Sequence, residues 1–297
     1  MDLAPAPDRI AALPCWTGRP RAAPLPGGLS NEIWKVEDEA GAHVVRFGRD
    51  YPCHHVSRAR EQMTTRAAHA AGFAPAVEWT AEGVMVTAFV TSRTWDAAEV
   101  RANPQRLATL LRDFHQKMPE EVSGPPYLFS PFLMARDYAR TLAAGNSPHL
   151  PQVPRLLALT RALERTQPPL HLVFGHNDLL PANLLDDGSR LWLIDYEYAG
   201  FASPLFDLAG AASNAGMDKA QSDALLTAYF GQPPDEPLRR AFDAMACASL
   251  LRESMWAMAS AIHLSAPGAD YDAYAAENLA KLDEALDAFQ SRHGRLE

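Results

Sequence analysis

Hydrophobic and polar residues follow a strand-like pattern in the first part of the chain. Short runs rich in Val, Ile and aromatic residues lie at 32–36, 43–47 and 83–90, and the turn-like sequence EDEAGA joins the first two. Such runs are typical of β-strands, and two of them around a short turn predict a hairpin. One helix is expected at 56–71, because Pro75 lies soon after its end.

From about residue 95 the pattern becomes that of amphipathic helices. One helix is indicated by apolar residues three and four positions apart, at Leu107, Leu110, Leu111 and Phe114. Further helices are expected at 132–143, 153–165, 205–214, 219–229, 239–264 and 272–289. A single compact β-region, 171–196, interrupts them with the strand-like segments HLVFG, NLL and LWLID.

The two patterns together predict an α+β protein with two lobes. Residues 1–90 would form a small strand-rich lobe and residues 91–297 a larger helical lobe, with a hinge near 91–96. A chain of 297 residues is long enough to bury one large core or two lobes with a cleft between them.

Polar residues suited to phosphoryl transfer gather within the β-region. The sequence HNDLLPAN at 176–183 is followed by a short hairpin and by IDYE at 194–197. Phosphoryl transfer needs a carboxylate for the attacking hydroxyl and oxygen ligands for Mg²⁺. Asp178 offers the first, and the hairpin would return Asn183 and Asp195 to one edge as the second. The alternatives are turn and capping residues, or a metallohydrolase site, which a second histidine at ligand spacing would favour.

These two stretches resemble a known group of kinases. HNDLLPAN is similar to the H-x-D-x-x-x-x-N catalytic loop of protein kinases and small-molecule kinases. LIDYEYAG, with SPLFDLA after it, resembles the metal-binding segment of the choline/ethanolamine kinase branch of the aminoglycoside phosphotransferase superfamily. The resemblance implies a protein-kinase-like fold, ATP and Mg²⁺ between the lobes, Asp178 as the base, and Asn183 and Asp195 as magnesium ligands. His176 and Asp207 would have structural roles in supporting the loop.

The resemblance extends to the nucleotide side. GGLSNEIWKV and VVRF are similar to the first strands of choline kinases, and paired glycines let backbone N–H groups approach phosphates. Arg46 would contact phosphate where most kinases have Lys, and Glu61 would hold it, unless Glu61 lies on a solvated helix face. Thr87 would be the gatekeeper before the adenine-binding hinge. The nucleotide-binding residues expected are Gly28, Ser30, Asn31, Arg46, Glu61, Thr87, Ala88, Phe89 and Val90.

The helix expected at 239–264 has two stripes, one of which fits an acceptor site. The core stripe contains Cys247, Leu251, Met255, Met258 and Ile262, and the second contains Ser249, Glu253, Trp256, Ser260 and His263. A Trp one turn from a Glu can bind an ammonium group; the alternative is that Trp256 packs in the core. The acceptor-binding residues expected are Glu197, Tyr198, Glu253, Trp256 and, in a YxxYA segment that resembles one of choline kinases, Tyr271. Asn214 and Glu253 depart from eukaryotic choline kinases, which carry an acidic residue and a second Trp there.

Composition narrows the function further. The formal net charge of −9 argues against nucleic acid as a partner. Three widely spaced cysteines and the lack of a signal peptide or a long apolar run favour a cytoplasmic protein without a membrane span. We expect a kinase of a small, cationic amino alcohol such as choline or ethanolamine. Aminoglycoside or thiamine kinases are alternatives, as is a non-catalytic nucleotide-binding protein with this fold; the oligomeric state is not predicted.

Overall fold

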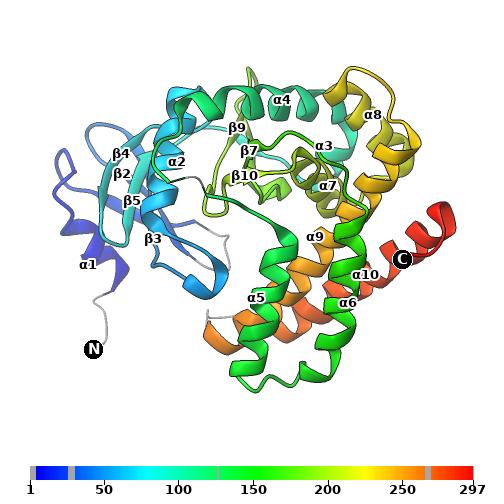
Figure 1. Ribbon diagram of the computed structural model, residues 1–297. Coiled ribbons are helices and arrows are strands. Elements are labelled where there is room, and N and C mark those ends of the chain that lie inside the picture. Colours follow the sequence, from blue (N-terminus) through cyan, green and yellow to red (C-terminus); the bar gives the residue numbers. More distant parts are fainter. Residues whose placement is uncertain (1–4, 26–30, 126, 265–268, 297) are drawn as a thin grey trace.

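One antiparallel sheet forms the centre of the N-terminal lobe (Figure 1). The structure, a computed structural model, describes residues 5–25, 31–125, 127–264 and 269–296. The strand order is β1-β2-β3-β5-β4, with bounds Arg21–Pro24 for β1, Glu32–Glu37 for β2, Ala42–Phe47 for β3, Val77–Ala81 for β4 and Val84–Ala88 for β5. Trp34 pairs with Val45 across β2 and β3. The hairpin predicted from the sequence is therefore confirmed.

Two helices flank this sheet. The short helix α1 (Ala6–Ala11) brings Ile10 into a small core with Val36, Val45 and Val86, which alternate along their strands as a half-buried sheet requires. Helix α2 (Arg58–Ala70) begins at Ser57, whose hydroxyl accepts a hydrogen bond from the backbone N–H of Arg60. Because α2 contacts both β4 and α4 of the other lobe, it links the two lobes.

The C-terminal lobe is mainly helical and encloses the larger core. Its helices are α3 (Ala97–Ala102), α4 (Pro104–Glu121), α5 (Pro131–Ala144), α6 (Val153–Arg165), α7 (Pro204–Ala215), α8 (Lys219–Phe230), α9 (Glu236–His263) and α10 (Tyr271–His293). Helix α9 packs against α5, α6, α7 and α10. The predicted core stripe is buried from Cys247 to Met258, and neighbours on several sides also bury Ser249, Trp256 and Ser260 of the second stripe.

The three strands predicted within 171–196 are confirmed, and they belong to two small sheets. Strand β7 (Val173–Gly175) pairs with β10 (Gly200–Ala202). Strands β8 (Leu184–Asp186) and β9 (Leu191–Leu193) form a hairpin that pairs instead with β6 (Arg93–Thr94). The chain turns away after β7 because Asn177 adopts a left-handed conformation with φ of 63°. The loop between β7 and β8 thus stands between the two sheets.

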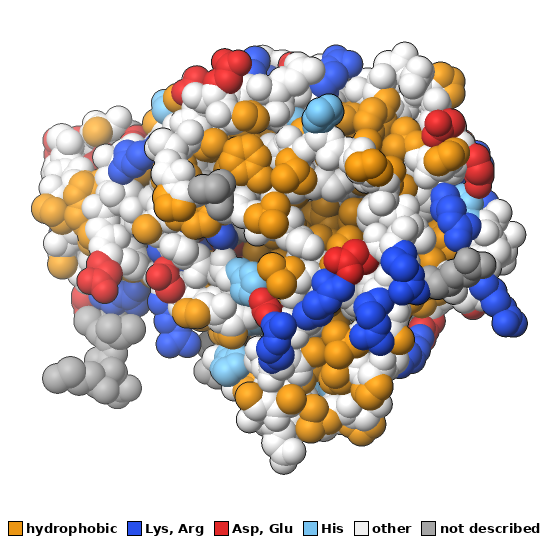
Figure 2. Space-filling view, in the orientation of Figure 1, with side chains coloured by type: hydrophobic (Ala, Val, Ile, Leu, Met, Phe, Trp, Pro, Cys, Tyr) orange, Lys and Arg blue, Asp and Glu red, His pale blue; other side chains and the backbone are white. Residues whose placement is uncertain are grey.

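Lys and Arg side chains gather over α5 and α6 on the face shown in Figure 2. Several of them are paired with carboxylates: Arg136 with Glu164, Arg140 with Asp137, and Arg155 with Asp283. These pairs neutralise much of the local charge, so the patch does not resemble the unpaired basic surface that binds nucleic acid. Among the described residues, none of the helices combines the length and apolar character needed to cross a bilayer.

His54, in η1 (Pro52–His54), joins the two lobes. Its environment predicts that the stability of the protein depends on pH. Its Nε2 lies 3.2 Å from Ser260 Oγ, and burial, followed by the charge of Arg252, lowers its pKa to about 3. In the unfolded chain the imidazole of His54 is protonated below about pH 6.5, whereas in the folded chain it stays neutral. The free energy of unfolding should therefore fall by about 1.4 kcal/mol per pH unit below that value.

The variant His54→Gln should lose this part of the pH dependence. Urea unfolding of wild type and variant at pH 7 and pH 5 measures it, with the exposed His171 changed to Gln as a control. Equal pH sensitivity in wild type and His54→Gln would contradict the prediction.

Candidate active site

Backbone and side-chain hydrogen bonds fix the loop that carries Asp178. The Asn177 side-chain amide donates to the carbonyls of Tyr198 and Gly200, each at 3.1 Å. His176 Nε2 lies 2.9 Å from the Ile194 carbonyl oxygen. Gly175 allows this close packing, because a Cβ there would lie 2.8 Å from Asn177 Oδ1. The side chain of His176 thus ties the loop to the segment that carries Asp195.

Asp207, at the start of α7, holds the same loop through hydrogen bonds to its backbone. Its two carboxylate oxygens accept the backbone N–H groups of His176 and Asn177, both at 2.7 Å. His115 Nε2 on α4 lies 2.9 Å from Asp207 Oδ2, and the Tyr229 hydroxyl lies 2.7 Å from His115 Nδ1. Burial alone would raise the pKa of Asp207, but the hydrogen bond and charge of His115 lower it overall. These contacts are the ones expected of a residue that braces the loop. His115 is absent from the sequence prediction, because it reads as one more residue of an amphipathic helix.

Asp178 is half-buried, and its surroundings disfavour the ionised form of its carboxyl group. Burial raises the pKa of its carboxyl well above the usual range; Arg252 opposes this, and the charges of Asp195 and Glu253 add to it. The Asn183 amide donates to the Asp178 carbonyl oxygen at 2.8 Å and approaches its Oδ2 at 3.5 Å. A carboxylate with a raised pKa is a stronger base than an ordinary one, which suits proton acceptance from a hydroxyl.

Asn183 and Asp195 lie next to each other, as magnesium ligands would. Asn183 ends η3 (Pro181–Asn183), and its carbonyl oxygen accepts the N–H of Ile194 at 3.1 Å. Asp195 has φ of 67°, a left-handed conformation that turns the chain directly after Ile194. Among the described residues, no group of three or more His, Cys, Asp and Glu side chains has metal-binding geometry. The Asn183 amide oxygen and Asp195 carboxylate fit Mg²⁺, which usually takes one or two protein carboxylates together with phosphates and water.

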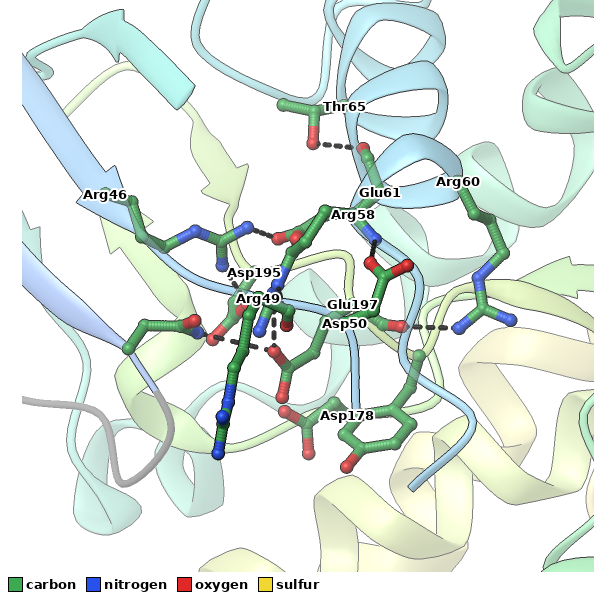
Figure 3. A network of polar contacts seen from close by, with 12 residues as sticks. Arg46, Arg49, Asp50, Arg58, Arg60, Glu61, Thr65, Asp178, Asp195 and Glu197 are labelled. Carbon is green, nitrogen blue, oxygen red and sulfur yellow. Dashed lines mark hydrogen bonds and ion pairs between the residues drawn. The ribbon is translucent and has the colours of Figure 1, made fainter. Parts of the chain in front are cut away.

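Arg46 joins the two lobes directly at this point. Its Nη1 lies 2.7 Å from Asp195 Oδ1, and its Nη2 forms an ion pair with Glu61 on α2 (Figure 3). Arg58 donates from Nη1 to Glu61 Oε2 at 2.6 Å and to Glu197 Oε2 at 3.0 Å. Figure 3 shows Asp178 beside this network, without a dashed contact to it.

Glu197 belongs to this network of arginines. Asn31 Nδ2 donates to Glu197 Oε2 at 3.3 Å, and Arg60 Nη2 donates to its backbone carbonyl at 2.6 Å. Burial raises the pKa of Glu197, as does Asp195, while Arg58 and Arg46 counteract the shift. The carboxylate expected to bind the acceptor therefore faces the N-terminal lobe. Arg58 and Arg60 were missed by the sequence reasoning, although Arg58 stands three residues before Glu61, a helical pairing distance.

The remaining nucleotide-side residues lie along β5 and the chain after it. Thr87 and Ala88 are in β5, where Ala88 donates its N–H to Ala76 at 2.9 Å. Phe89 donates its N–H to the carbonyl oxygen of Ala42 at 3.0 Å, so the N–H groups of Ala88 and Phe89 are both bonded within the sheet. These two N–H groups are therefore not available to donate to adenine. Gly28 and Ser30 lie outside the described residues.

Four aromatic side chains meet around Trp256. The Trp256 indole N–H donates to the Tyr198 hydroxyl at 3.0 Å, and the rings of Tyr271 and Tyr274 meet the Trp256 ring edge-on at 6.0 and 6.1 Å. The Tyr274 hydroxyl donates to Glu253 Oε1 at 3.0 Å. Tyr198, Glu253, Trp256 and Tyr271 are thus gathered in one place.

Arg252 completes this aromatic group and was not predicted. Its guanidinium carbon lies 4.4 Å from the centre of the Tyr198 ring, and its Nη1 donates to Glu253 Oε2 at 2.6 Å. A lone Arg in a long helix normally reads as a solvated side chain. The signal available in the sequence is its position one turn before Trp256.

Comparisons with known proteins agree with this arrangement. A solved structure of a choline/ethanolamine kinase family protein from Mesorhizobium loti is 28% identical, covers 97% of this chain and 96% of its own, and has a TM-score of 0.76. The probable ethanolamine kinase of Arabidopsis thaliana is 27% identical over 203 residues, which are 61% of this chain and 53% of that protein. Protein LicA of Haemophilus influenzae is 46% identical over 57 residues, 19% of this chain and 21% of LicA.

The matches to these curated relatives therefore span about half of their length or less. The protein-kinase-like fold and the resemblance to choline and ethanolamine kinases, both expected from the sequence, are confirmed. Residues 21–243, most of the chain, match the phosphotransferase enzyme family in sequence. The chain belongs to the phosphotransferase enzyme family.

Proposed function

We propose that this chain catalyses the ATP- and Mg²⁺-dependent phosphorylation of a hydroxyl group on a small amino alcohol. The observation that carries the proposal is the position of Arg46, which contacts Glu61 of the N-terminal lobe and Asp195 of the C-terminal lobe at once. A cation for phosphate and a carboxylate for magnesium thereby stand together, close to the half-buried Asp178. Family membership and the likeness to choline/ethanolamine kinases support the same reaction.

Each residue has a definite task in this proposal. Asp178 accepts the proton of the attacking hydroxyl, and its raised pKa makes that acceptance more favourable. Arg46, held by Glu61, contacts phosphate oxygens with its planar fork of donors. Asn183 and Asp195 would hold Mg²⁺, which would supply positive charge to stabilise the phosphates during transfer. Val90 would bind adenine through its backbone.

The aromatic group around Trp256 is proposed as the acceptor site. Trp256, Tyr198 and Tyr271 are all buried, so they form a wall from which water is largely excluded. Aromatic faces attract ammonium groups, most strongly where water is excluded. An amino alcohol bound there would have its hydroxyl near Asp178, and choline and ethanolamine are the simplest candidates.

A screen of acceptors tests the proposed function. ATP consumption is measured over amino alcohols, thiamine and aminoglycosides, with and without Mg²⁺. We expect turnover of at least one amino alcohol, and loss of that turnover when EDTA removes the metal. ATP binding without turnover of any acceptor would overturn the proposal in favour of a non-catalytic nucleotide-binding protein. Preference for thiamine or an aminoglycoside would instead reassign the acceptor.

A further inference from the structure

A buried arginine in the proposed acceptor site keeps unused hydrogen-bond donors. The Arg252 side chain is 5% exposed and forms an ion pair with Glu253 through Nη1. Its Nε and Nη2 are buried and have no hydrogen-bond partner among the described residues. Leaving charged donors buried and unpaired costs free energy, so a site that does so is suited to a ligand that supplies the missing acceptors.

The neighbours of Arg252 are residues of the proposed acceptor site. Its guanidinium lies over the Tyr198 ring, and the Tyr198 hydroxyl accepts the indole N–H of Trp256. Burial alone would lower the pKa of Arg252, but Glu253 raises it, with further contributions from two tyrosines and from Asp178. Arg252 therefore stays charged and lies close enough to Asp178 for the two charges to interact.

Carboxylates suited to an ammonium group are already paired with buried arginines. Glu253 accepts from Tyr274 at Oε1 and from Arg252 at Oε2. Glu197 accepts from Arg58 at Oε2. The atoms of Arg252 that have no partner are hydrogen-bond donors, and they are therefore complementary to an anion.

We propose that the acceptor alcohol carries an anionic group, a carboxylate or a phosphate, which accepts hydrogen bonds from Nε and Nη2 of Arg252. These two nitrogens form one edge of the guanidinium plane, so both oxygens of such a group can bind side by side. The inference rests on the proposed function and narrows its substrate class to alcohols that bear a negative charge, so that choline and ethanolamine themselves would be poor acceptors. An amino alcohol that fits would be a zwitterion, with its ammonium group on the aromatic wall. Arg252 is then a determinant of specificity.

Matched pairs of acceptors test this assignment. L-serine is ethanolamine with an added carboxylate, and glycerol 3-phosphate is glycerol with an added phosphate. Steady-state kinetics give the ratio of kcat/KM between the members of each pair, which cancels any effect common to both, such as a change at Asp178. We expect wild type to prefer the charged member of at least one pair, and Arg252→Met to reduce that preference by about 10- to 100-fold through KM. An unchanged ratio in Arg252→Met, or a wild-type preference for ethanolamine and glycerol, would overturn the inference.

Two further variants guard against misfolding and general effects. Arg252→Lys keeps the charge without the planar fork and should show an intermediate ratio, even if Arg252→Met does not fold. Arg239→Met removes another buried arginine of α9, one whose terminal nitrogens pair with Asp223 and Asp243, and should leave the ratio unchanged.

Calorimetric binding of L-serine and of glycerol 3-phosphate separates this inference from the proposed function. Arg252-dependent binding without phosphoryl transfer to any acceptor supports the anion site and overturns the kinase assignment. Transfer to uncharged or purely cationic alcohols, without Arg252-dependent binding of either anion, supports the kinase assignment and overturns the anion site.

Discussion

Asp178→Asn should lower kcat by about 10²- to 10⁴-fold, because an amide cannot accept the hydroxyl proton that a carboxylate accepts. The change is nearly isosteric and lies outside the Arg46–Glu61 contacts, so KM for ATP should change little. Coupled assays of ADP release at saturating acceptor measure kcat directly. A variant that keeps wild-type kcat on the best acceptor would show that Asp178 is not the base.

The same variant should be more stable than wild type in the absence of nucleotide and metal. Folding raises the pKa of Asp178 through burial, so the ionised carboxylate opposes folding at neutral pH, and a neutral Asn removes that opposition. Thermal unfolding at pH 7 should therefore give a higher Tm for Asp178→Asn. The exposed Asp283 on α10, changed to Asn, is the control and should alter neither kcat nor Tm appreciably. A lower Tm together with lost activity would indicate misfolding as the cause of the loss.

The long elements of the fold could be predicted from the sequence because their burial is periodic. Helix α4 has one buried face, with Leu107, Leu111 and Phe114 inside, and its pattern marks it clearly. Short elements have no such signal. The prediction omitted β4, which pairs with β5 through a register irregularity near Val77, and α1, which has a single helical turn and a half. Pairing between β7 and β10 depends on the turn at Asn177, which the residue type permits without demanding it.

The proposed catalytic loop could be located in the sequence for a different reason, since its groups lie close together there. Asp178, Asn183 and Asp195 fall within one short segment, and the hairpin between the last two fixes their approach. The residues that set the charge of the site come from distant segments. Arg58 pairs with Glu197 across 139 positions, and His115 with Asp207 across 92. A sequence shows that a carboxylate is present, whereas its neutralising partner depends on the tertiary fold.

Asp207→Asn should destabilise the protein and slow the reaction, because the Asp207 carboxylate holds the backbone of the Asp178 loop. Removing the charge leaves His115 without its buried partner and places an amide N–H₂ against a backbone N–H donor. Breaking a buried pair of this kind costs about 3–5 kcal/mol in free energy of unfolding. The backbone at His176 and Asn177 should relax, which would displace Asp178 and lower kcat more than it changes KM for ATP. Urea unfolding at pH 7 and steady-state kinetics measure the two effects.

The pH dependence distinguishes this pair from an ordinary packing contact. Because the folded-state pKa of Asp207 is lowered, its contribution to stability is complete above about pH 4, the unfolded value, and disappears as pH falls through the folded value. The stability difference between wild type and Asp207→Asn should therefore narrow below about pH 4. In a double-mutant cycle, the effects of His115→Gln and Asp207→Asn on the free energy of unfolding should be coupled by about 1–3 kcal/mol, because a buried contact joins the two side chains. Additive effects, or a stability difference that persists unchanged in acid, would mean that Asp207 acts by shape alone and that its charge does not hold the loop.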